Sequence, residues 1–174
     1  MSVLKVYLYG SRVLSQPTRP VEALPEDFSQ ILNDMFETMY DDDGIGLSAN
    51  QVGIDLSFFV ADFSLHDENM GRQVFINPEI LAADGSSTLE EGCLSVPEIR
   101  EEVTRPDRIR VRYRDPDGNT HEEEFAGFPA RVIQHETDHL NGIFFVDRIS
   151  PLRKSFIAGR LKKIAAQARK EGTV

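Results

Sequence analysis

The sequence is poor in several features that would each point to a whole class of protein. It has no tryptophan and one cysteine, Cys93, so an internal disulfide is excluded and a reducing compartment is expected. Its longest apolar runs, such as 58–61 and 143–146, are only a few residues long, which excludes a membrane-spanning helix. The first ten residues hold one lysine and no long apolar block, unlike a secretory leader. We therefore expect a cytoplasmic protein that does not associate with membranes.

Basic residues are also scarce, and they are unevenly placed. The chain has 19 Lys and Arg against 29 Asp and Glu, a net charge of −10. Residues 1–150 carry 12 basic and 28 acidic residues (−16), whereas residues 151–174 carry seven basic residues and one acidic residue (+6). The body should therefore repel nucleic acid, and only the C-terminal segment could attract it.

The length and the patterning predict one domain, residues 1–174. The chain has 174 residues, with no internal repeat and no linker rich in Gly, Pro or Ser. Apolar residues recur at helical spacing from Pro25 to about residues 41–44. Strand patterns follow at 58–62 and 73–80, and a hairpin over 108–127 is centred on the turn 115–118.

Two further helices are predicted in the last third of the chain. One begins after Phe128-Pro129 and ends at Asn141-Gly142. The other is basic, covers about residues 150–170, and has Ser150 as its N-cap and Pro151 at its first position. Its apolar stripe is predicted to be Leu152, Phe156, Leu161, Ile164 and Ala165. Strands grouped before helices favour an α+β fold with mostly antiparallel sheet.

The run His135-Glu136-Thr137-Asp138-His139 is the sharpest chemical feature. On a helix, histidines four residues apart project from one face and can hold one cation, with Glu136 beside it. A catalytic metal site usually has three protein ligands. Two zinc-peptidase patterns would supply the third, but one has Phe145 at the required position and the other has only Glu171 downstream. An ordinary zinc peptidase is therefore not favoured.

Three residues are candidates for the third ligand: Cys93, His66 and His121. Both histidines lie in polar segments and are interpreted as solvated. Cys93 lies in residues 90–97, interpreted as a glycine-containing loop that could bring a thiolate and backbone N–H groups to a metal. A thiolate with two imidazoles suits Zn(II) or Fe(II). Taken alone, however, the cysteine is more readily explained as a buried structural residue.

A third segment, residues 44–53, is rich in small residues. It has no Lys-Ser or Lys-Thr after its glycines, so a nucleotide site is not favoured. The pattern indicates a close backbone approach to an extended ligand, with Gln51 offering an amide donor.

Together the three segments resemble the peptide deformylases. That family has G-x-G-x-A-A-x-Q, E-G-C-x-S and H-E-x-D-H-L-x-G in this order, which correspond here to residues 44–51, 91–95 and 135–142. The resemblance extends from residue 1 to about residue 165. One departure is Ser48, where alanine is usual, which places a hydroxyl near the substrate cleft.

The resemblance implies a hydrolase that removes the N-formyl group from formyl-methionine at the N-terminus of new polypeptides and releases formate. Mostly antiparallel sheets would pack around a central metal-binding helix, with one helix N-terminal and one C-terminal to them. The metal ligands would be Cys93, His135 and His139, and Glu136 would transfer protons. The family's metal is Fe(II), with Zn(II), Ni(II) or Co(II) possible.

The resemblance also implies how the substrate is held. The Gln51 side chain and the Leu94 backbone N–H would stabilise the developing negative charge on the formyl oxygen. Residues implied to contact the formyl group or to line the methionine pocket are Gly46, Ile45, Leu89, Phe128, Arg131 and Val132. Arg131 is expected at the rim, with its stem packed and its head in water.

Further contacts and competing functions complete the sequence-based hypotheses. We expect Arg105 to pair with Glu91, and Asp138 to orient a ligand or close a local salt bridge. The competing functions are a metallopeptidase that cleaves internal bonds and an idle, ribosome-associated metal-binding module. The second is disfavoured because holding a metal requires neither Glu136 nor Gln51. The basic C-terminal helix is either a solvated helix packed on the body or a weak ribosome contact.

Overall fold

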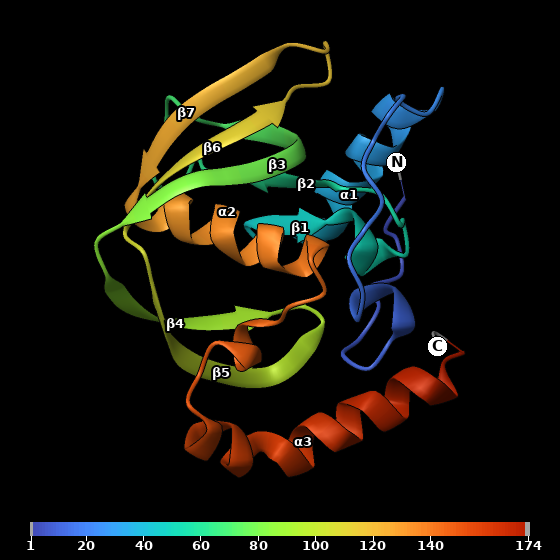
Figure 1. The fold of residues 1–174 in the computed structure, drawn as a ribbon. Helices are drawn as coiled ribbons and strands as arrows, with labels where there is room; N and C mark the ends of the chain where they lie inside the picture. The colour runs from blue at the N-terminus through green and yellow to red at the C-terminus, as the bar shows by residue number, and fades with distance from the viewer. Residues whose placement is uncertain (1, 173–174) are drawn as a thin grey trace.

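The computed structural model describes residues 2–172, and Figure 1 shows its helices and strands. The helices are α1 (Phe28–Asp41), α2 (Gly127–Leu140) and α3 (Pro151–Lys170). The strands are β1 (Gly46–Ser48), β2 (Phe58–Asp62), β3 (Arg72–Asp84), β4 (Ser87–Cys93), β5 (Val96–Arg105), β6 (Arg108–Arg114) and β7 (Thr120–Ala126). Short 3-10 turns cover Arg12–Leu14, Ala49–Val52 and Phe145–Asp147.

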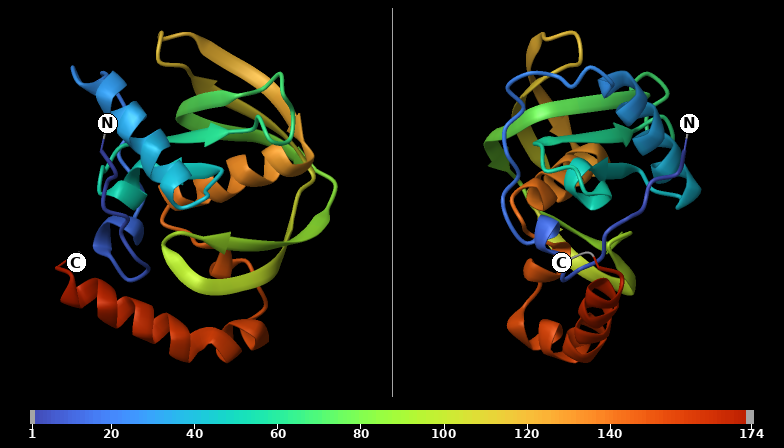
Figure 2. Two further views of the ribbon diagram at one scale, coloured as in Figure 1. Left: turned by 180° about the vertical axis from the view of Figure 1, so that it is seen from behind. Right: turned by 90° about the vertical axis from the view of Figure 1, so that its right-hand side faces the viewer.

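Two antiparallel sheets enclose α2. The larger has the order β1-β2-β3-β6-β7, and the smaller is the β4–β5 hairpin. Figure 1 shows α2 between them, with β1 running along one side of the helix. In Figure 2, α1 lies at the β1 edge, and α3 runs past the hairpin at the far end of the molecule. The α+β fold around a central helix is therefore confirmed.

The core explains why α2 takes the central place. Its apolar residues Ala130 and Ile133 pack into the same buried cluster as Phe59 and Phe75 of the large sheet. A second cluster joins β5 to α3, and a third joins α1 to β1 and β2. Since the sheet takes up one face of α2, its polar face is turned toward the hairpin.

Most of the predicted elements lie where the sequence placed them. Strands β2 and β6 have the predicted bounds, and β3 continues beyond residue 80 to Asp84. At the start of α3, the Ser150 side chain accepts a hydrogen bond from the Arg153 backbone N–H, and Pro151 is the first helical residue, as predicted. No helix in residues 2–172 is long and apolar enough to cross a membrane.

The segment around Cys93 was wrongly interpreted as a loop, because β4 ends at Cys93 and pairs with β5. The buried apolar positions of β5, Val96, Ile99 and Val103, are three and four residues apart. Strands are recognised by alternation of buried and exposed residues, and this spacing hides it. An irregularity in the pairing between Glu91 and Cys93 further disturbs the alternation.

The predicted apolar stripe of α3 is also partly wrong. Leu152 and Phe156 are 67% and 77% exposed. The residues that α3 buries are Ile157, Leu161, Ile164 and Ala168. The predicted and the observed buried residues both follow helical spacing, so spacing alone cannot identify the buried face of α3. The buried face is the one that packs against β5.

Candidate metal centre

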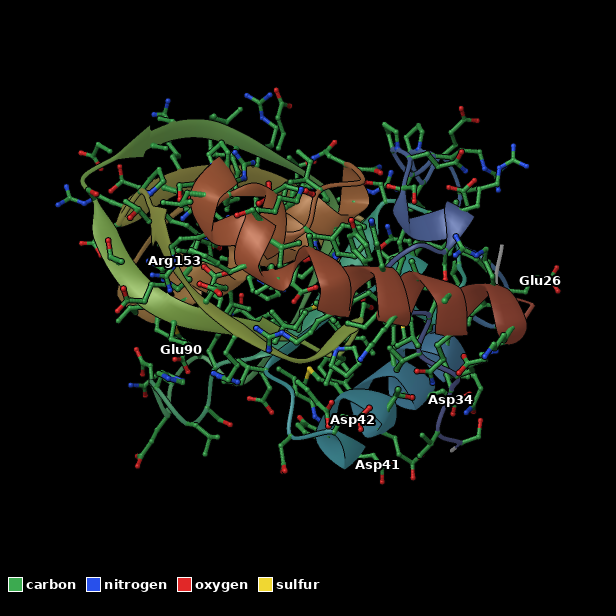
Figure 3. All side chains as sticks on the ribbon, turned by 90° about the horizontal axis from the view of Figure 1, so that it is seen from below. Glu26, Asp34, Asp41, Asp42, Glu90 and Arg153 are labelled. Carbon is green, nitrogen blue, oxygen red and sulfur yellow. The ribbon has the colours of Figure 1, made fainter. Side chains whose placement is uncertain are left out.

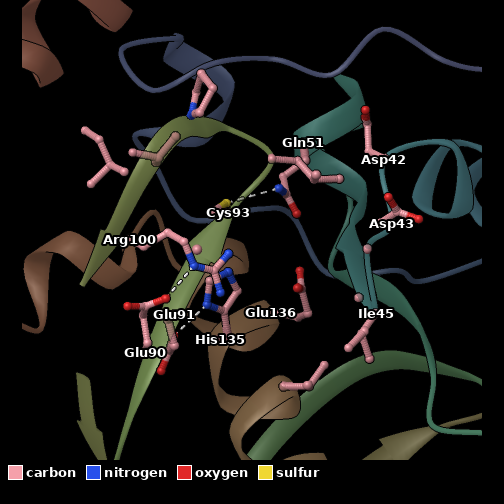
Figure 4. Close-up of a pocket in the computed structure, with 18 of the residues that line it drawn as sticks. Asp42, Asp43, Ile45, Gln51, Glu90, Glu91, Cys93, Arg100, His135 and Glu136 are labelled. Atoms are coloured by element: carbon pink, nitrogen blue, oxygen red, sulfur yellow. Dashed lines mark hydrogen bonds and ion pairs between the residues drawn. The ribbon is translucent and has the colours of Figure 1, made fainter. Parts of the chain in front are cut away.

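Helix α2 and the end of β4 bring three ligand side chains to one point. His135 and His139 are one turn apart on α2, and Cys93 reaches them from β4 (Figure 4). The Cys93 Sγ is 3.1 Å from the His139 Nε2, and one donor atom from each of the three residues lies within 4.8 Å of the others. One sulfur and two nitrogen donors at this separation fit a single divalent ion such as Zn(II) or Fe(II).

A buried carboxylate, Glu91, fixes the orientation of His135. It accepts a hydrogen bond of 2.8 Å from the His135 Nδ1. The Nε2 of the same ring is therefore the atom available to bind a metal ion. Arg105 also binds Glu91, at 2.7 and 3.0 Å, so the predicted pair is present. Burial opposes ionisation of Glu91, but its bonds to His135 and Arg105 prevail and lower its pKa to about 2.

Asp138 forms a local salt bridge, as predicted. Its carboxylate accepts hydrogen bonds from Arg105 at 2.8 Å and from Arg148 at 2.6 Å. Asp138 therefore extends the ion-pair network of Glu91 along the side of α2 that faces the hairpin.

Arg131 does not project into water, which corrects the expectation of a rim position. It is 4% exposed. Its Nη1 donates to Glu91 at 2.6 Å and to the Val103 carbonyl at 2.9 Å, and its Nη2 donates to the Ser87 carbonyl at 2.8 Å. A guanidinium can be buried when a carboxylate and carbonyl oxygens replace its water. Arg131 thus fastens α2 to the hairpin while lining the cleft.

Glu136 lies beside the three ligands and is 4% exposed. Its Oε2 has no hydrogen-bond partner within residues 2–172. Burial raises the pKa of Glu136 to about 7. Gly46 makes its position possible, because a Cβ at residue 46 would lie 2.7 Å from the Glu136 Oε1. A carboxyl group of this kind can exchange protons near neutral pH.

His139 is held uncharged. Burial is the main cause that places its pKa well below the ordinary value. A neutral imidazole is the form that binds a metal ion.

Ser48 orients Gln51, a role that was not recognised in the sequence. The Ser48 backbone N–H and hydroxyl both donate to the Gln51 Oε1, at 3.0 and 2.9 Å. The Gln51 Nε2 consequently points to the Ser95 hydroxyl at 3.1 Å and to the Cys93 Sγ at 3.5 Å. The serine at residue 48, where the family usually has alanine, was the feature of the sequence that could have indicated this role.

A cleft of about 640 Å³ opens onto these groups. Of the residues named from the sequence, those that line it are Ile45, Gly46, Gln51, Glu91, Cys93, Leu94, Phe128, Arg131, Val132, His135 and Glu136. Leu89 is 48% exposed on β4 and is not part of the lining found in residues 2–172. The lining also includes charged residues that the sequence had not singled out: Asp42, Asp43, Glu90, Glu98 and Arg100.

The other two candidate ligands lie outside the metal cluster found in the described chain. His121 bonds to Asp115 at 2.7 Å on the β6–β7 hairpin. The His66 ring stacks on Phe128 with 4.0 Å between the ring centroids. His66 is exposed, as expected, and its ring also contacts this cleft residue.

A thiolate, two imidazoles and an adjacent buried carboxyl group define a hydrolase that uses a single metal ion. The family model for polypeptide deformylase matches residues 3–155, and the chain belongs to this family.

Similar proteins extend over nearly the whole chain. The peptide deformylase of Nitrobacter hamburgensis is 43% identical, over 98% of this chain and 100% of the relative. The crystal structure of a peptide deformylase from Legionella pneumophila has a TM-score of 0.85 and 37% identity, covering 97% of this chain and 99% of that one. The Ehrlichia chaffeensis enzyme, solved in complex with actinonin, has a TM-score of 0.85 and 36% identity, covering 94% and 98%.

Proposed function

We propose that this chain hydrolyses the N-formyl group of formyl-methionine at the N-terminus of new polypeptides and releases formate. The observation that carries the proposal is the unpaired, buried Oε2 of Glu136 beside Cys93, His135 and His139. An idle metal-binding module has no need of such a carboxyl group. The comparisons with known proteins likewise do not favour a peptidase of internal bonds.

Cys93, His135 and His139 would hold the metal, which we propose to be Fe(II), with Zn(II), Ni(II) or Co(II) as alternatives. A divalent ion bound there lowers the pKa of a water molecule and polarises the formyl oxygen. Glu136 accepts a proton from the attacking water and delivers it to the departing amine.

The remaining residues position the formyl-methionine. The Gln51 Nε2 and the Leu94 backbone N–H donate to the formyl oxygen as negative charge develops there. Gly46 packs against Glu136, and we propose that it lies close enough to the formyl carbon to exclude the extra methyl group of an acetyl group. The methionine side chain is proposed to contact Ile45, Leu89, Phe128, Val132 and the aliphatic stem of Arg131.

The test is a formate-release assay on protein purified without oxygen, with its metal content measured. A formyl-methionyl peptide should release formate, whereas its acetyl counterpart should react far more slowly because of the extra methyl group. A peptide with a cleavable internal bond serves as the control. Cleavage of that peptide, or equal rates on formyl and acetyl peptides, contradicts the proposal.

We also propose that the enzyme works in the cytoplasm and touches the ribosome weakly through α3. The cations of this helix without an ion-pair partner within residues 2–172 include Lys162, Lys163, Arg169 and Lys170. A phosphate-rich surface would attract them while repelling the acidic body, so binding should weaken steeply as salt rises.

Changing these four residues to Gln should abolish cosedimentation with ribosomes at low salt. The matched control is Arg110→Gln with Arg112→Gln on β6, which should cosediment as the parent does. If the α3 variant cosediments as well as the parent protein, the ribosome contact is contradicted, and α3 is a solvated helix packed on the body.

A further inference from the structure

The N-terminal segment, residues 2–11, runs along one end of the molecule from α1 toward α3 (Figure 1, Figure 2). It belongs to none of the helices and strands described above. The Ser2 N–H donates to the Asp34 side chain on α1 at 2.8 Å, and Figure 3 labels this aspartate. The Leu4 N–H donates to the Thr38 hydroxyl on the same helix at 2.8 Å. The segment is therefore placed by contacts with distant parts of the chain.

Further along, two backbone hydrogen bonds join this segment to the residues that carry the proposed donors to the formyl oxygen. The Tyr7 N–H donates to the Gln51 carbonyl at 2.7 Å, and the Tyr9 N–H donates to the Ser95 carbonyl at 2.8 Å. Ser95 follows Leu94 in the two-residue turn between β4 and β5. Positions two residues apart are separated by at most about 7 Å, even in a fully extended chain. The segment therefore limits how far the Gln51 backbone and the turn can separate.

The rings of the two half-buried tyrosines hold the segment against the body. The Tyr7 ring lies so close to Gly53 that a Cβ at residue 53 would be 2.8 Å from the Tyr7 Cε2. The Tyr9 ring contacts Phe144 edge to face, with 4.9 Å between the ring centroids. Loss of either ring should therefore loosen the backbone hydrogen bond made by the same residue.

A side-chain hydrogen bond joins the same two parts of the chain on the cleft side. The Gln51 Nε2 donates to the hydroxyl of Ser95, which is fully buried, at 3.1 Å. Both groups sit on bonds that can rotate, so this contact does not by itself fix the two backbones. Donors stabilise a developing negative charge only when they are already in place, and a displacement of about 1 Å can cost about 100-fold in rate. The bonds from residues 7 and 9 supply the missing restraint.

We propose that Tyr7 and Tyr9 are positioning residues, which hold the Gln51 side chain and the Leu94 backbone N–H at the separation that the formyl oxygen requires in the transition state. This inference rests on the proposed function. Neither tyrosine is among the residues of the described chain that line the cleft. Because they act on donors to charge that develops during the reaction, their loss should lower kcat and leave KM nearly unchanged.

The first test measures kcat, KM and metal content for Tyr7→Ala and Tyr9→Ala on a formyl-methionyl peptide. In each variant kcat per bound metal should fall by about fivefold or more, the scale of one hydrogen bond. Tyr7→Phe and Tyr9→Phe keep the rings and should keep the parent's kcat. An unchanged kcat per bound metal in both alanine variants overturns the proposal, and so does a loss confined to KM.

A double-mutant cycle tests whether Tyr7 acts through Gln51. In the Gln51→Ala background the donor is already absent, so adding Tyr7→Ala should lower kcat by less than about twofold. A general disturbance of the fold would instead lower kcat in this background as much as it does in the parent. That additive result overturns the positioning role.

A second variant isolates the backbone bond, because Tyr7→Ala also removes a ring. Replacing Tyr7 with the corresponding α-hydroxy acid, by nonsense suppression, removes the N–H and keeps the ring, and kcat should fall as in Tyr7→Ala. The matched control is the same replacement at Tyr113 of β6, a strand paired on both sides that does not line the cleft of the described chain. The control should lower Tm and keep the parent's kcat.

The parent's kcat in the residue-7 ester overturns the proposal, as does an equal fall of kcat in the Tyr113 control. A failure of the proposed function is distinct from both results. In that case the metal-loaded parent itself releases no formate from formyl-methionyl peptides.

Discussion

At the scale of single residues, the three ligands and Glu136 should respond differently to substitution. Cys93→Ala, His135→Ala and His139→Ala should each lose the metal, because two protein donors bind a divalent ion far more weakly than three. Glu136→Gln should keep the metal and lose turnover by about 100-fold or more, the scale of general acid–base catalysis. Metal analysis and formate release measure both effects. Full occupancy in Cys93→Ala, or metal loss in Glu136→Gln, contradicts these roles.

Ser48 offers a finer test of the site. Ser48→Ala removes the hydroxyl that binds the Gln51 Oε1 at 2.9 Å, although the backbone bond from residue 48 remains. One such hydrogen bond is worth about 1 kcal/mol, so kcat should fall by about fivefold. KM should change little, because the amide acts mainly on charge that develops during the reaction. Ser48→Thr, which keeps the hydroxyl, should restore kcat, and a change confined to KM would contradict the role.

Asp115, far from the cleft, should make the β6–β7 hairpin sensitive to acid. Its hydrogen bond with His121 is the main cause that lowers the pKa of Asp115 to about 2. A lowered pKa in the folded state stabilises the fold above the unfolded value of about 4, and this stabilisation is lost as the pH falls from about 4 toward 2. His121→Ala should return the Asp115 pKa toward about 4 in a carbon-detected NMR titration. An unchanged titration would rule out His121 as the cause.

At the scale of elements, α3 should be held by the residues it buries and not by its exposed apolar pair. Leu161 is 4% exposed and Phe156 is 77% exposed. Leu161→Ala should lower the free energy of unfolding by about 2–5 kcal/mol, whereas Phe156→Ala should change it by less than about 0.5 kcal/mol. Urea unfolding of the two variants provides the comparison. Equal losses would mean that α3 packs through another face.

The elements that could be predicted are those whose local signals agree with their packing. In β6, the buried residues Ile109, Val111 and Tyr113 alternate with exposed arginines, and a strong turn follows. The β4–β5 hairpin has no such alternation. Its two strands pair with each other in a separate sheet, and the buried residues of β5 follow their packing against α3, which is distant in the sequence. The choice of face on α3 is also not local, because it depends on contacts with β5.

The site, like the fold, could be predicted only where the signal lies in a short stretch of sequence. The ligands and Glu136 belong to short motifs in which spacing carries the chemistry. The burial of Arg131 was not predictable, because it depends on Glu91 and on two carbonyl groups of the hairpin. The charged cleft residues Asp42, Asp43 and Glu98 were missed because they come from separate segments, the end of α1 and the β4–β5 hairpin.

At the scale of the whole molecule, the metal should act as a cross-link between the two sheets. Its ligands lie on β4 and on α2, which packs against the large sheet. An ion that binds the folded state and not the unfolded chain stabilises the fold by mass action. Removal by a chelator should therefore lower Tm, and adding the metal back should restore it, as measured by calorimetry. A Tm that does not change when the metal is removed would contradict this coupling.

The ligands also lie far apart along the chain, since Cys93 and His139 are 46 positions apart. A chain is synthesised from its N-terminus, so the cysteine is made well before the helix that carries both histidines. Until α2 exists, the hairpin lacks the helix that covers it, and the thiol lacks the two histidines that later lie beside it. During that interval Cys93 is open to oxidation, and the yield of active protein should depend on how reducing the cell is while the chain is being made.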